Sequence, residues 1–393
     1  MENVVIVEAK RTPIGSFGGN LSSFSAPELG ATAIREVIKQ SGIRPDDVQE
    51  VVFGNVLTAG IGQAPARQAA LKAGLSELTP ATTVNKVCAS GMKAAMIAAN
   101  QIQLGEADII VAGGMESMSN VPYYLHEHRF GSKLGHTQTE DGILKDGLWD
   151  VYNDFHMGNA AEICAEECNI NREQQDEFAI SSYKRAIQAH EEGAFANEII
   201  EMKVSDRKGN VEKITMDQEL ERVNFDKIPD LRPVFDKKGT VTAANASSIN
   251  DGAAALLLMR ESKAKELGLN PLARIISQAS AAKKPEWFTT APSDAMPKAI
   301  KRAKLNKSDI DLFEINEAFS VVSLANNKIM ELNPEKVNIH GGAVSIGHPI
   351  GCSGARILVT LIYALKKTGG KLGCAGICNG GGGASAMVIE MTG

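Results

Sequence analysis

The sequence lacks any long hydrophobic run. Its longest uninterrupted apolar stretch, residues 253–259, is far shorter than the roughly 20 residues that a membrane-spanning helix needs. The start of the chain carries neither a basic stretch before an apolar core nor an Arg-rich amphipathic segment, and residues 390–393 contain no Ser-Lys-Leu signal. We therefore expect no membrane partner and a cytoplasmic protein, or one in the mitochondrial matrix if a transit peptide has been removed.

Cysteine is scarce, with six residues in a chain of 393. That number is too small for a disulfide scaffold, so we expect reduced thiols. Cys164 and Cys168 are four residues apart on an expected helix, but no second pair at zinc-site spacing accompanies them. Ordinary helix packing is the favoured interpretation. The same holds for His126 and His128, which lie in a polar stretch that we predict to be a loop.

An excess of charge of either sign is also absent. The 41 basic and 47 acidic residues leave a net charge of −6, which argues against a nucleic-acid-binding surface. Hydrophobic residues make up 44% of the chain, enough to bury a large core in two or three structural units. No Gly-Lys-Ser or Gly-Lys-Thr follows the glycine run 380–383, which excludes a phosphate-binding P-loop there.

Strand-like and helix-like segments alternate in the first part of the chain. Apolar residues at periods of two and 3.6 predict the elements. The predicted strands are 4–7, 50–56 and 82–86, and the predicted helices are 27–40, ending at Gly42, and 63–72. This alternation indicates a layered α/β protein.

One segment of the first half is repeated in the second. Residues 89–105 form a predicted helix followed by the strand 107–112 and two glycines. Residues 352–369 likewise form a helix, followed by the strand 372–378 and the glycine run. The two copies predict two halves built on one plan.

The stretch from Met115 to about Asn245 breaks this pattern. It is rich in polar residues and contains one clear helix, which Asn171 can cap with support from Gln174 and which Gly193 ends. We interpret the stretch as an inserted loop domain. Long insertions on a rigid scaffold usually carry binding function.

Cys88 is the first candidate for chemistry. It follows a predicted strand and directly precedes the helix that residues 89–91 open. A helix N-terminus lowers the pKa of a thiol and favours the nucleophilic thiolate. The alternative is a buried structural cysteine.

Three further segments offer partners for a nucleophile. His348 lies in residues 341–351, a stretch too glycine-rich for a regular element, and is either a base or a loop histidine bonded to carbonyls. Cys378 ends a strand and enters the glycine run, whose bare amides either face developing negative charge or form a simple turn. Asn316 lies where the strand 311–315 meets a helix and can be an ordinary cap.

Together these segments resemble the thiolase family. The motifs 87–92 (VCASGM), 316–319 (NEAF), 347–349 (GHP) and 378–380 (CNG) occur in that family's order and spacing. The resemblance begins at residues 9–13 (AKRTP) and extends to the last strand, so it covers essentially the whole chain.

The resemblance implies an α/β thiolase fold, a duplicated five-layered αβαβα core with an inserted loop domain. In this sequence the N-terminal half would be residues 1–118 and the loop domain residues 119–248. The chain would rejoin the first half at about 249–270, and residues 271–393 would form the C-terminal half. The loop domain would bind coenzyme A, and the family's assembly implies a homotetramer made of two dimers.

The resemblance also implies the chemistry. His348 would take the proton of Cys88, whose thiolate accepts an acetyl group from a thioester. Cys378 would then deprotonate a second acetyl-CoA, and the carbanion would attack the acetyl group to give acetoacetyl-CoA. His348 with a water held by Asn316 would stabilise one oxyanion, and the amides of Cys88 and Gly380 the other.

Within the family the sequence resembles the short-chain, acetoacetyl-CoA type, with a broader 3-ketoacyl-CoA thiolase of fatty-acid degradation as the alternative. Ten residues match positions that contact coenzyme A or narrow the acyl pocket: His156, Met157, Arg222, Lys227, Phe235, Ala243, Ser247, Phe288, Ala318 and Phe319. For Arg222 and Lys227 a solvated charged loop is the other interpretation. Phe288 leaves cleavage of 2-methylacetoacetyl-CoA open.

The resemblance implies a possible potassium ion but no zinc and no nucleotide redox cofactor. A phenol and main-chain carbonyls suit a hard cation, and the matching positions are Tyr183, Ala243, Ala244, Ala246 and Val344.

Two rival classes of protein share parts of the pattern of catalytic motifs. Decarboxylating synthases of the same fold generally do not need a second cysteine such as Cys378, and a silent acyl-CoA-binding relative would not need all four catalytic side chains.

Overall fold

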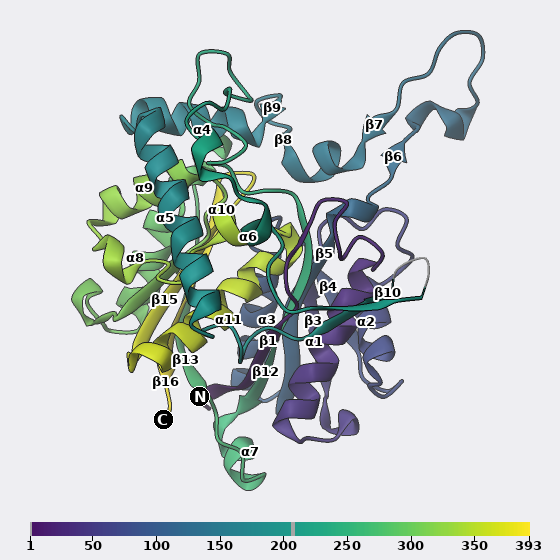
Figure 1. The fold of residues 1–393 in the computed structure, drawn as a ribbon. Coiled ribbons are helices and arrows are strands. Elements are labelled where there is room, and N and C mark those ends of the chain that lie inside the picture. The colour runs from purple at the N-terminus through teal and green to yellow at the C-terminus, as the bar shows by residue number, and fades with distance from the viewer. Residues whose placement is uncertain (1, 206–208) are drawn as a thin grey trace.

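The computed structural model describes residues 2–205 and 209–393. Its centre is a ten-stranded sheet in the order β14-β15-β16-β13-β1-β12-β5-β3-β4, with β2 paired to β12 (Figure 1). The strands are β1 Val4–Arg11, β2 Gly15–Ser16, β3 Glu50–Gly54, β4 Ala81–Val84, β5 Ile109–Ser117, β12 Asn250–Arg260, β13 Ala273–Ala282, β14 Leu312–Ile315, β15 Leu372–Asn379 and β16 Gly383–Met391. The principal helices of the two halves are α1 Ala26–Ser41, α2 Pro65–Ala73, α3 Ser90–Leu104, α8 Pro292–Arg302, α9 Ser320–Met330 and α11 Ile350–Thr368.

The same pairing pattern occurs twice in this sheet. In the first half, β3 is parallel to β5, β5 is antiparallel to β12, and β12 is antiparallel to β1. In the second, β14 is parallel to β15, β15 is antiparallel to β16, and β16 is antiparallel to β13. Residues 4–6 of β1 pair with residues 273–275 of β13 and join the halves. The predicted duplication is therefore confirmed.

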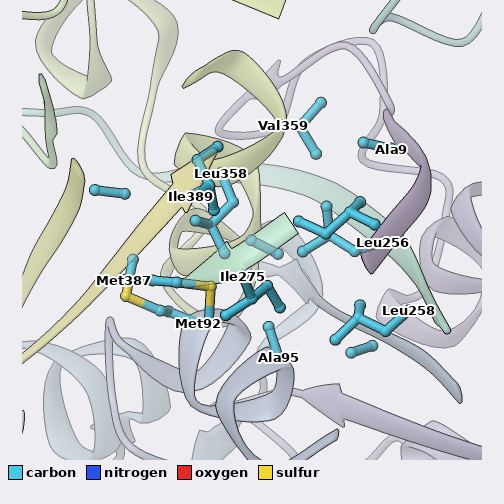
Figure 2. Close-up of a cluster of buried hydrophobic side chains, with 14 of the residues drawn as sticks. Ala9, Met92, Ala95, Leu256, Leu258, Ile275, Leu358, Val359, Met387 and Ile389 are labelled. Carbon is cyan, nitrogen blue, oxygen red and sulfur yellow. The ribbon is translucent and has the colours of Figure 1, made fainter. Parts of the chain in front are cut away.

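Helices cover both faces of each half. Helices α3 and α11 meet in the middle, where Met92 and Ala95 of α3 and Leu358 of α11 pack with strand residues from both halves (Figure 2). Helices α1 and α2 cover the outer face of the first half, and α8 covers the outer face of the second. Two sheet halves, a shared central helix layer and two outer helix layers make the expected five-layered αβαβα arrangement.

Most predicted elements lie within a few residues of the observed ones, but two predictions about irregular segments are wrong. The glycine-rich stretch 341–351 contains the short helix α10, Ala343–Ile346, and the start of α11. Glycines flank this helix rather than interrupt it, and Gly347 ends it with φ 108°. His126 and His128 lie in an exposed 3-10 helix, His126–Phe130, and not in a loop.

The segment between β5 and β12 contains small elements and two long helices. These are β6 Tyr123–Tyr124, β7 Glu140–Asp141, β8 Trp149–Asp150, β9 Phe155–His156, α4 Met157–Glu167, α5 Arg172–Glu191, β10 Met202–Ser205, β11 Val211–Ile214 and α6 Glu219–Arg222. The predicted cap is confirmed, because the Asn171 side chain accepts a bond from the amide of Gln174 at 2.9 Å and the Gln174 side chain accepts one from the amide of Asn171.

Arg11 of β1 fastens this segment to the sheet. Its fully buried guanidinium lies 2.5 Å from Glu198 and 2.7 Å from Asp217, both also buried. The hairpin of β6 and β7 instead projects from the body of the molecule (Figure 1). None of the helices in the described parts of the chain has the length and apolar character required to cross a bilayer.

Candidate active site

Cys88 stands at a strained turn between β4 and α3. Val87, directly before it, has φ 47°, a left-handed conformation that costs a β-branched residue free energy. The Ser90 hydroxyl holds this turn closed, because it donates to the carbonyl of Val87 at 2.5 Å and accepts from the amide of Lys86 at 2.8 Å. The turn places the half-buried Cys88 at the N-terminal end of α3.

The sequence predicted that the helix terminus lowers the pKa of Cys88 below its ordinary value. This prediction is wrong. Burial raises the pKa of this thiol to about 11, although the amides of Gly380 and of Cys88 itself donate toward the sulfur and act in the opposite direction. Desolvation outweighs these two donors. Cys88 is therefore a protonated thiol at neutral pH and needs a base when it reacts.

His348 has a nitrogen available for that role. Its Nδ1 atom lies 2.6 Å from the hydroxyl oxygen of Ser353, which is also 3.0 Å from the carbonyl oxygen of Pro349. A hydroxyl has one proton, so the arrangement that satisfies both contacts has Ser353 donating to Pro349 and accepting Nδ1–H. The Nε2 atom is then unprotonated, and it is buried with no partner among the described residues.

Burial also keeps His348 neutral. It lowers the pKa of the imidazole to about 3, and the nearby positive charge of Arg356 acts in the same direction. The main chain of the residue is fixed as well, because its amide donates to the Asn250 side chain at 2.8 Å. A neutral imidazole with a free, positioned Nε2 is what a general base requires.

Cys378 is fully buried near the end of β15. Burial raises the pKa of its thiol well above the ordinary value, and the neighbouring Cys88 acts in the same direction. The glycines after it form the β15–β16 turn, in which Gly381 and Gly382 have φ 80° and 81°. The glycine run is therefore a turn, and Gly380 within it directs its amide at Cys88.

Asn316 is not a helix cap. Helix α9 begins four residues later, at Ser320, with Phe319 in the capping position. The Asn316 side chain is fully buried, and neither its nitrogen nor its oxygen has a partner among the described residues. A buried amide in this state is a place where an ordered water can bind.

Glu116 connects segments next to the site through hydrogen bonds, and the sequence did not indicate this role. This buried carboxylate accepts bonds from the amides of Val56, Leu57 and Gly351 at 3.1, 3.1 and 2.8 Å and from the Asn55 side chain. It thereby joins the loop after β3 to the first turn of α11. Burial raises its pKa to about 7. No local pattern marks Glu116, because its partners lie far away in the chain.

Cys88, His348 and Gly380 line one cavity of about 390 Å³. Eight of the ten residues expected at coenzyme A line it too: His156, Met157, Phe235, Ala243, Ser247, Phe288, Ala318 and Phe319. Further lining residues that the sequence did not suggest include Met118, Leu148, Ile249 and Ile350. The described wall contains no carboxylate, lysine or arginine, so the cavity suits an uncharged acyl and amide chain.

Aromatic rings form one wall of the cavity. The rings of His156 and Phe235 stack with centroids 4.6 Å apart, and Phe235 meets Phe319 edge to face at 6.3 Å. Gly158 permits this packing, because a Cβ at that position would lie 2.2 Å from the Phe235 ring. Ser247 holds the opposite loop, since its hydroxyl donates to the carbonyl of Ala318 at 2.8 Å.

Of the other predicted residues, Ala246 also lines the cavity. Seven do not: Asn316, Cys378, Arg222, Lys227, Tyr183, Ala244 and Val344. Arg222 and Lys227 are exposed on α6 and on the 3-10 helix that follows it. Among the residues proposed for a cation, Tyr183 and Val344 belong to one buried cluster. The residues 243–246 form a neighbouring loop whose Ala243 and Ala246 face the cavity.

Family and structure comparisons agree with this geometry. Residues 4–262 match the thiolase N-terminal domain and residues 269–391 match the thiolase C-terminal domain. The chain is 58% identical over 391 residues to acetyl-CoA acetyltransferase 2 of Arabidopsis thaliana, covering 99% of this chain and 97% of the relative. It is 55% identical to the mitochondrial acetyl-CoA acetyltransferase of Bos taurus, covering 99% and 92%.

A solved structure extends the similarity to three dimensions. The crystal structure of Acat5 thiolase from Ascaris suum in complex with coenzyme A matches with a TM-score of 0.94 and 44% identity, over 100% of both chains. The matched regions include every strand of the central sheet and every residue of the cavity described above. The chain therefore belongs to the thiolase family.

Proposed function

We propose that this protein is an acetyl-CoA C-acetyltransferase that reversibly condenses two acetyl-CoA molecules to acetoacetyl-CoA and free coenzyme A. One observation carries the proposal: a thiol, a neutral imidazole nitrogen and a backbone amide meet at a single apolar cavity, at Cys88, His348 and Gly380. Relatives at 55–58% identity that are named acetyl-CoA acetyltransferases support the choice of substrate.

The first stage transfers an acetyl group to the protein. His348 Nε2 takes the proton of Cys88, and the thiolate attacks the thioester carbon of acetyl-CoA. The amides of Cys88 and Gly380, which already donate toward the sulfur, stabilise the oxyanion. When the carbon–sulfur bond breaks, the Cys378 thiol gives its proton to the departing coenzyme A thiolate, which leaves acetyl-Cys88, a Cys378 thiolate and a protonated His348.

The second stage forms the carbon–carbon bond. The Cys378 thiolate removes a proton from the methyl group of a second acetyl-CoA, and the resulting carbanion attacks the carbonyl carbon of acetyl-Cys88. His348 returns its proton to the Cys88 sulfur as the carbon–sulfur bond breaks. A water bound by the Asn316 amide, together with His348, stabilises the enolate oxygen. The Cys88 thiol leaves as the new bond forms, and acetoacetyl-CoA is released.

Coenzyme A binding is assigned to the inserted domain, residues 119–248, with its thioester end in the cavity. The stacked rings of His156 and Phe235 would contact the uncharged pantetheine chain. Arg222 and Lys227 lie farther out on exposed elements of the same domain, where cations can pair with the nucleotide phosphates. The Ascaris suum thiolase, solved in complex with coenzyme A, supports this assignment.

The acyl pocket is proposed to be short. Phe235, Phe288 and Phe319 occupy its wall, and Phe288 is almost fully buried. Their bulk favours an acetyl group over the long chains that a broader 3-ketoacyl-CoA thiolase accepts. Assays with 2-methylacetoacetyl-CoA and with a long-chain 3-ketoacyl-CoA measure this preference, and faster cleavage of the long-chain substrate would contradict it.

A homotetramer and a potassium ion complete the proposal. The projecting β6–β7 segment exposes large apolar side chains, among them Phe130 and Leu134, which suit contact with further copies of the chain. The Tyr183 phenol and the carbonyls of residues 243, 244, 246 and 344 are oxygen donors of the kind that a hard cation takes. Static light scattering and sedimentation measure the assembly.

The function is tested by mixing the purified protein with acetoacetyl-CoA and coenzyme A and following loss of the β-ketothioester. A rapid quench followed by peptide mass spectrometry should find acetyl on the peptide that contains Cys88. The Cys88→Ala variant should show neither acetylation nor turnover. Turnover by that variant, or acetylation at another cysteine of the wild type, would overturn the mechanism.

A further inference from the structure

Two thiols outside the cavity lie close together at the end of α4. The sulfur atoms of Cys164 and Cys168 are 3.9 Å apart. Four residues of α-helix separate two Cα atoms by about 6 Å, within the range of about 4.4–6.8 Å that a disulfide spans. The sulfurs must approach by roughly 2 Å to reach the S–S bond length of about 2.05 Å. The Cβ atoms of residues four apart on a helix lie about 5–6 Å apart, wider than the roughly 3.5–4.5 Å in a disulfide, so the end of α4 must shift for the bridge to form.

Cys168 occupies a position that permits this movement. It is the residue at which α4 ends, and Asn169 after it turns the chain with φ 51°. No further helical turn confines its side chain. Cys168 is partly exposed, whereas Cys164 is fully buried. An oxidant from solvent therefore meets Cys168 first.

The surroundings shift the pKa values of the two thiols in opposite directions. The hydrogen bond from Cys164 lowers the pKa of Cys168, and the positive charges of Lys328 and Lys283 add to this effect. Lys328 is fixed there, because its Nζ donates to the Cys168 carbonyl at 2.8 Å. The same contact, followed by burial, raises the pKa of Cys164.

Cys88 and Cys378, in contrast to Cys168, have raised pKa values and are protonated thiols at neutral pH. Burial raises the pKa of Cys88 to about 11 and that of Cys378 well above its ordinary value. Peroxides react with thiolates and not with thiols. At neutral pH the free protein thus presents its more reactive sulfur at Cys168, away from the cavity.

We propose that Cys164 and Cys168 form a reversible dithiol–disulfide site that consumes hydrogen peroxide before Cys88 and Cys378 are oxidised. The Cys168 thiolate attacks one peroxide oxygen, the O–O bond breaks, and protonation of the departing hydroxide gives water and a sulfenic acid. The Cys164 sulfur then attacks the Cys168 sulfur, its proton leaves with the oxygen as a second water, and the S–S bond forms. The two sulfurs lose two electrons and peroxide gains two.

The site adjoins the catalytic region without being part of it. Cys164 packs in the same apolar cluster as Cys378, Met157 and Phe319. The first turn of α4 faces the cavity, whereas the cysteine pair occupies its last turn. The bridge therefore changes the end of α4 that is away from the substrate. This inference does not depend on the proposed acetyl transfer.

Trypsin offers a direct readout, because residues 146–172 form one peptide that contains both cysteines. The full-length protein is treated with a small excess of hydrogen peroxide, denatured, alkylated and digested. We expect this peptide about 2 Da lighter and without alkylation, while the Cys88 and Cys378 peptides are still alkylated. Dithiothreitol should restore alkylation of both helix cysteines.

Matched variants test the order of events. In Cys164→Ser the Cys168 sulfenic acid cannot be resolved and should be trapped by dimedone, whereas in Cys168→Ser the buried Cys164 should stay reduced. Lys328→Gln should slow bridging several-fold with little effect on turnover. Oxidation of Cys88 or Cys378 while both helix cysteines are still alkylated would overturn the proposal, as would equal bridging rates in wild type and Lys328→Gln.

Discussion

The Nδ1 atom of His348 lies 2.6 Å from the Ser353 hydroxyl, and this contact decides which imidazole nitrogen carries the proton. The hydroxyl has its own acceptor in the carbonyl of Pro349, 3.0 Å away. The imidazole must therefore supply the proton of the bond, which leaves Nε2 free to act as a base. Ser353 is a positioning residue for the proposed chemistry.

Removing this hydroxyl should impair the base. We expect Ser353→Ala to lower kcat on the order of 10–100-fold with a smaller change in KM, because both tautomer and ring orientation are lost. Steady-state thiolysis kinetics measure kcat and KM separately. Ser323→Ala is the control, since it removes an equally buried hydroxyl that has no partner among the described residues. Equal losses in the two variants would contradict the positioning role.

Asn316 should matter for rate and not for stability. Because its side-chain amide bonds to no described protein atom, Asn316→Ala should leave the unfolding temperature nearly unchanged while kcat falls by about 10²–10³-fold. Asn338→Ala should behave in the opposite way. That amide bonds to the main chain of Ile315 twice and to Glu317, and its loss should cost about 1–3 kcal/mol. Thermal unfolding and kcat are measured on both variants.

Cys88 and Cys378 should be required at different stages of the reaction. Cys378→Ala should still take a radiolabelled acetyl group from acetyl-CoA but condense it at least about 10²–10⁴-fold more slowly, because the carbon base is gone. Cys88→Ala should take no label. Cys374→Ala removes another fully buried cysteine of β15, in the outer cluster of that half, and should retain both stages. Labelling of Cys88→Ala to the wild-type level would reverse the assignment.

His340 should make the fold sensitive to acid. Burial lowers its pKa from 6.5 to about 4, and Lys367 lowers it further while Glu192 acts in the opposite direction. Between about pH 6.5 and pH 4, His340 is protonated in the unfolded chain but neutral in the folded protein. The free energy of unfolding therefore falls as the pH decreases through this range. At about pH 5 this loss is on the order of 2 kcal/mol. Denaturant unfolding of His340→Gln at about pH 7 and pH 5 should show a correspondingly smaller loss than the wild type.

The cation proposal predicts a faster reaction in potassium than in sodium at equal ionic strength. Tyr183 is nearly buried, and burial raises the pKa of its phenol, so it stays a neutral oxygen donor. Tyr183→Phe should remove the difference between the two ions while leaving the activity in sodium unchanged. Identical wild-type rates in both buffers would exclude potassium activation.

Local sequence patterns predicted most of the framework. The cap at Asn171, the helix end at Gly42 and the strand before Cys88 depend on neighbouring residues, and each lies where it was expected. The repeated helix, strand and glycine segment predicted the two halves for the same reason. The motif residues Cys88, His348 and Gly380 line one cavity. Cys378 is not among the lining residues and lies in the adjoining apolar cluster with Met157 and Phe319.

The features that were missed depend on packing between distant segments. The direction of the Cys88 pKa shift is set by burial, which a helix-terminus argument does not include. Asn316 resembled a cap because α9 follows it, although the helix begins only at Ser320. Glu116 bonds to residues about 60 and 235 positions away. No period or motif in one sequence encodes such partners.

Strand β1 pairs with β12 on one edge and with β13 on the other, although it is the first strand to be synthesised. Its partners begin at Asn250 and Ala273. At roughly 5–20 residues per second, a ribosome needs on the order of tens of seconds to make the intervening chain. Until those strands have been made, the apolar residues 4–7 lack both partners of the native sheet, which leaves this segment open to non-native pairing during synthesis.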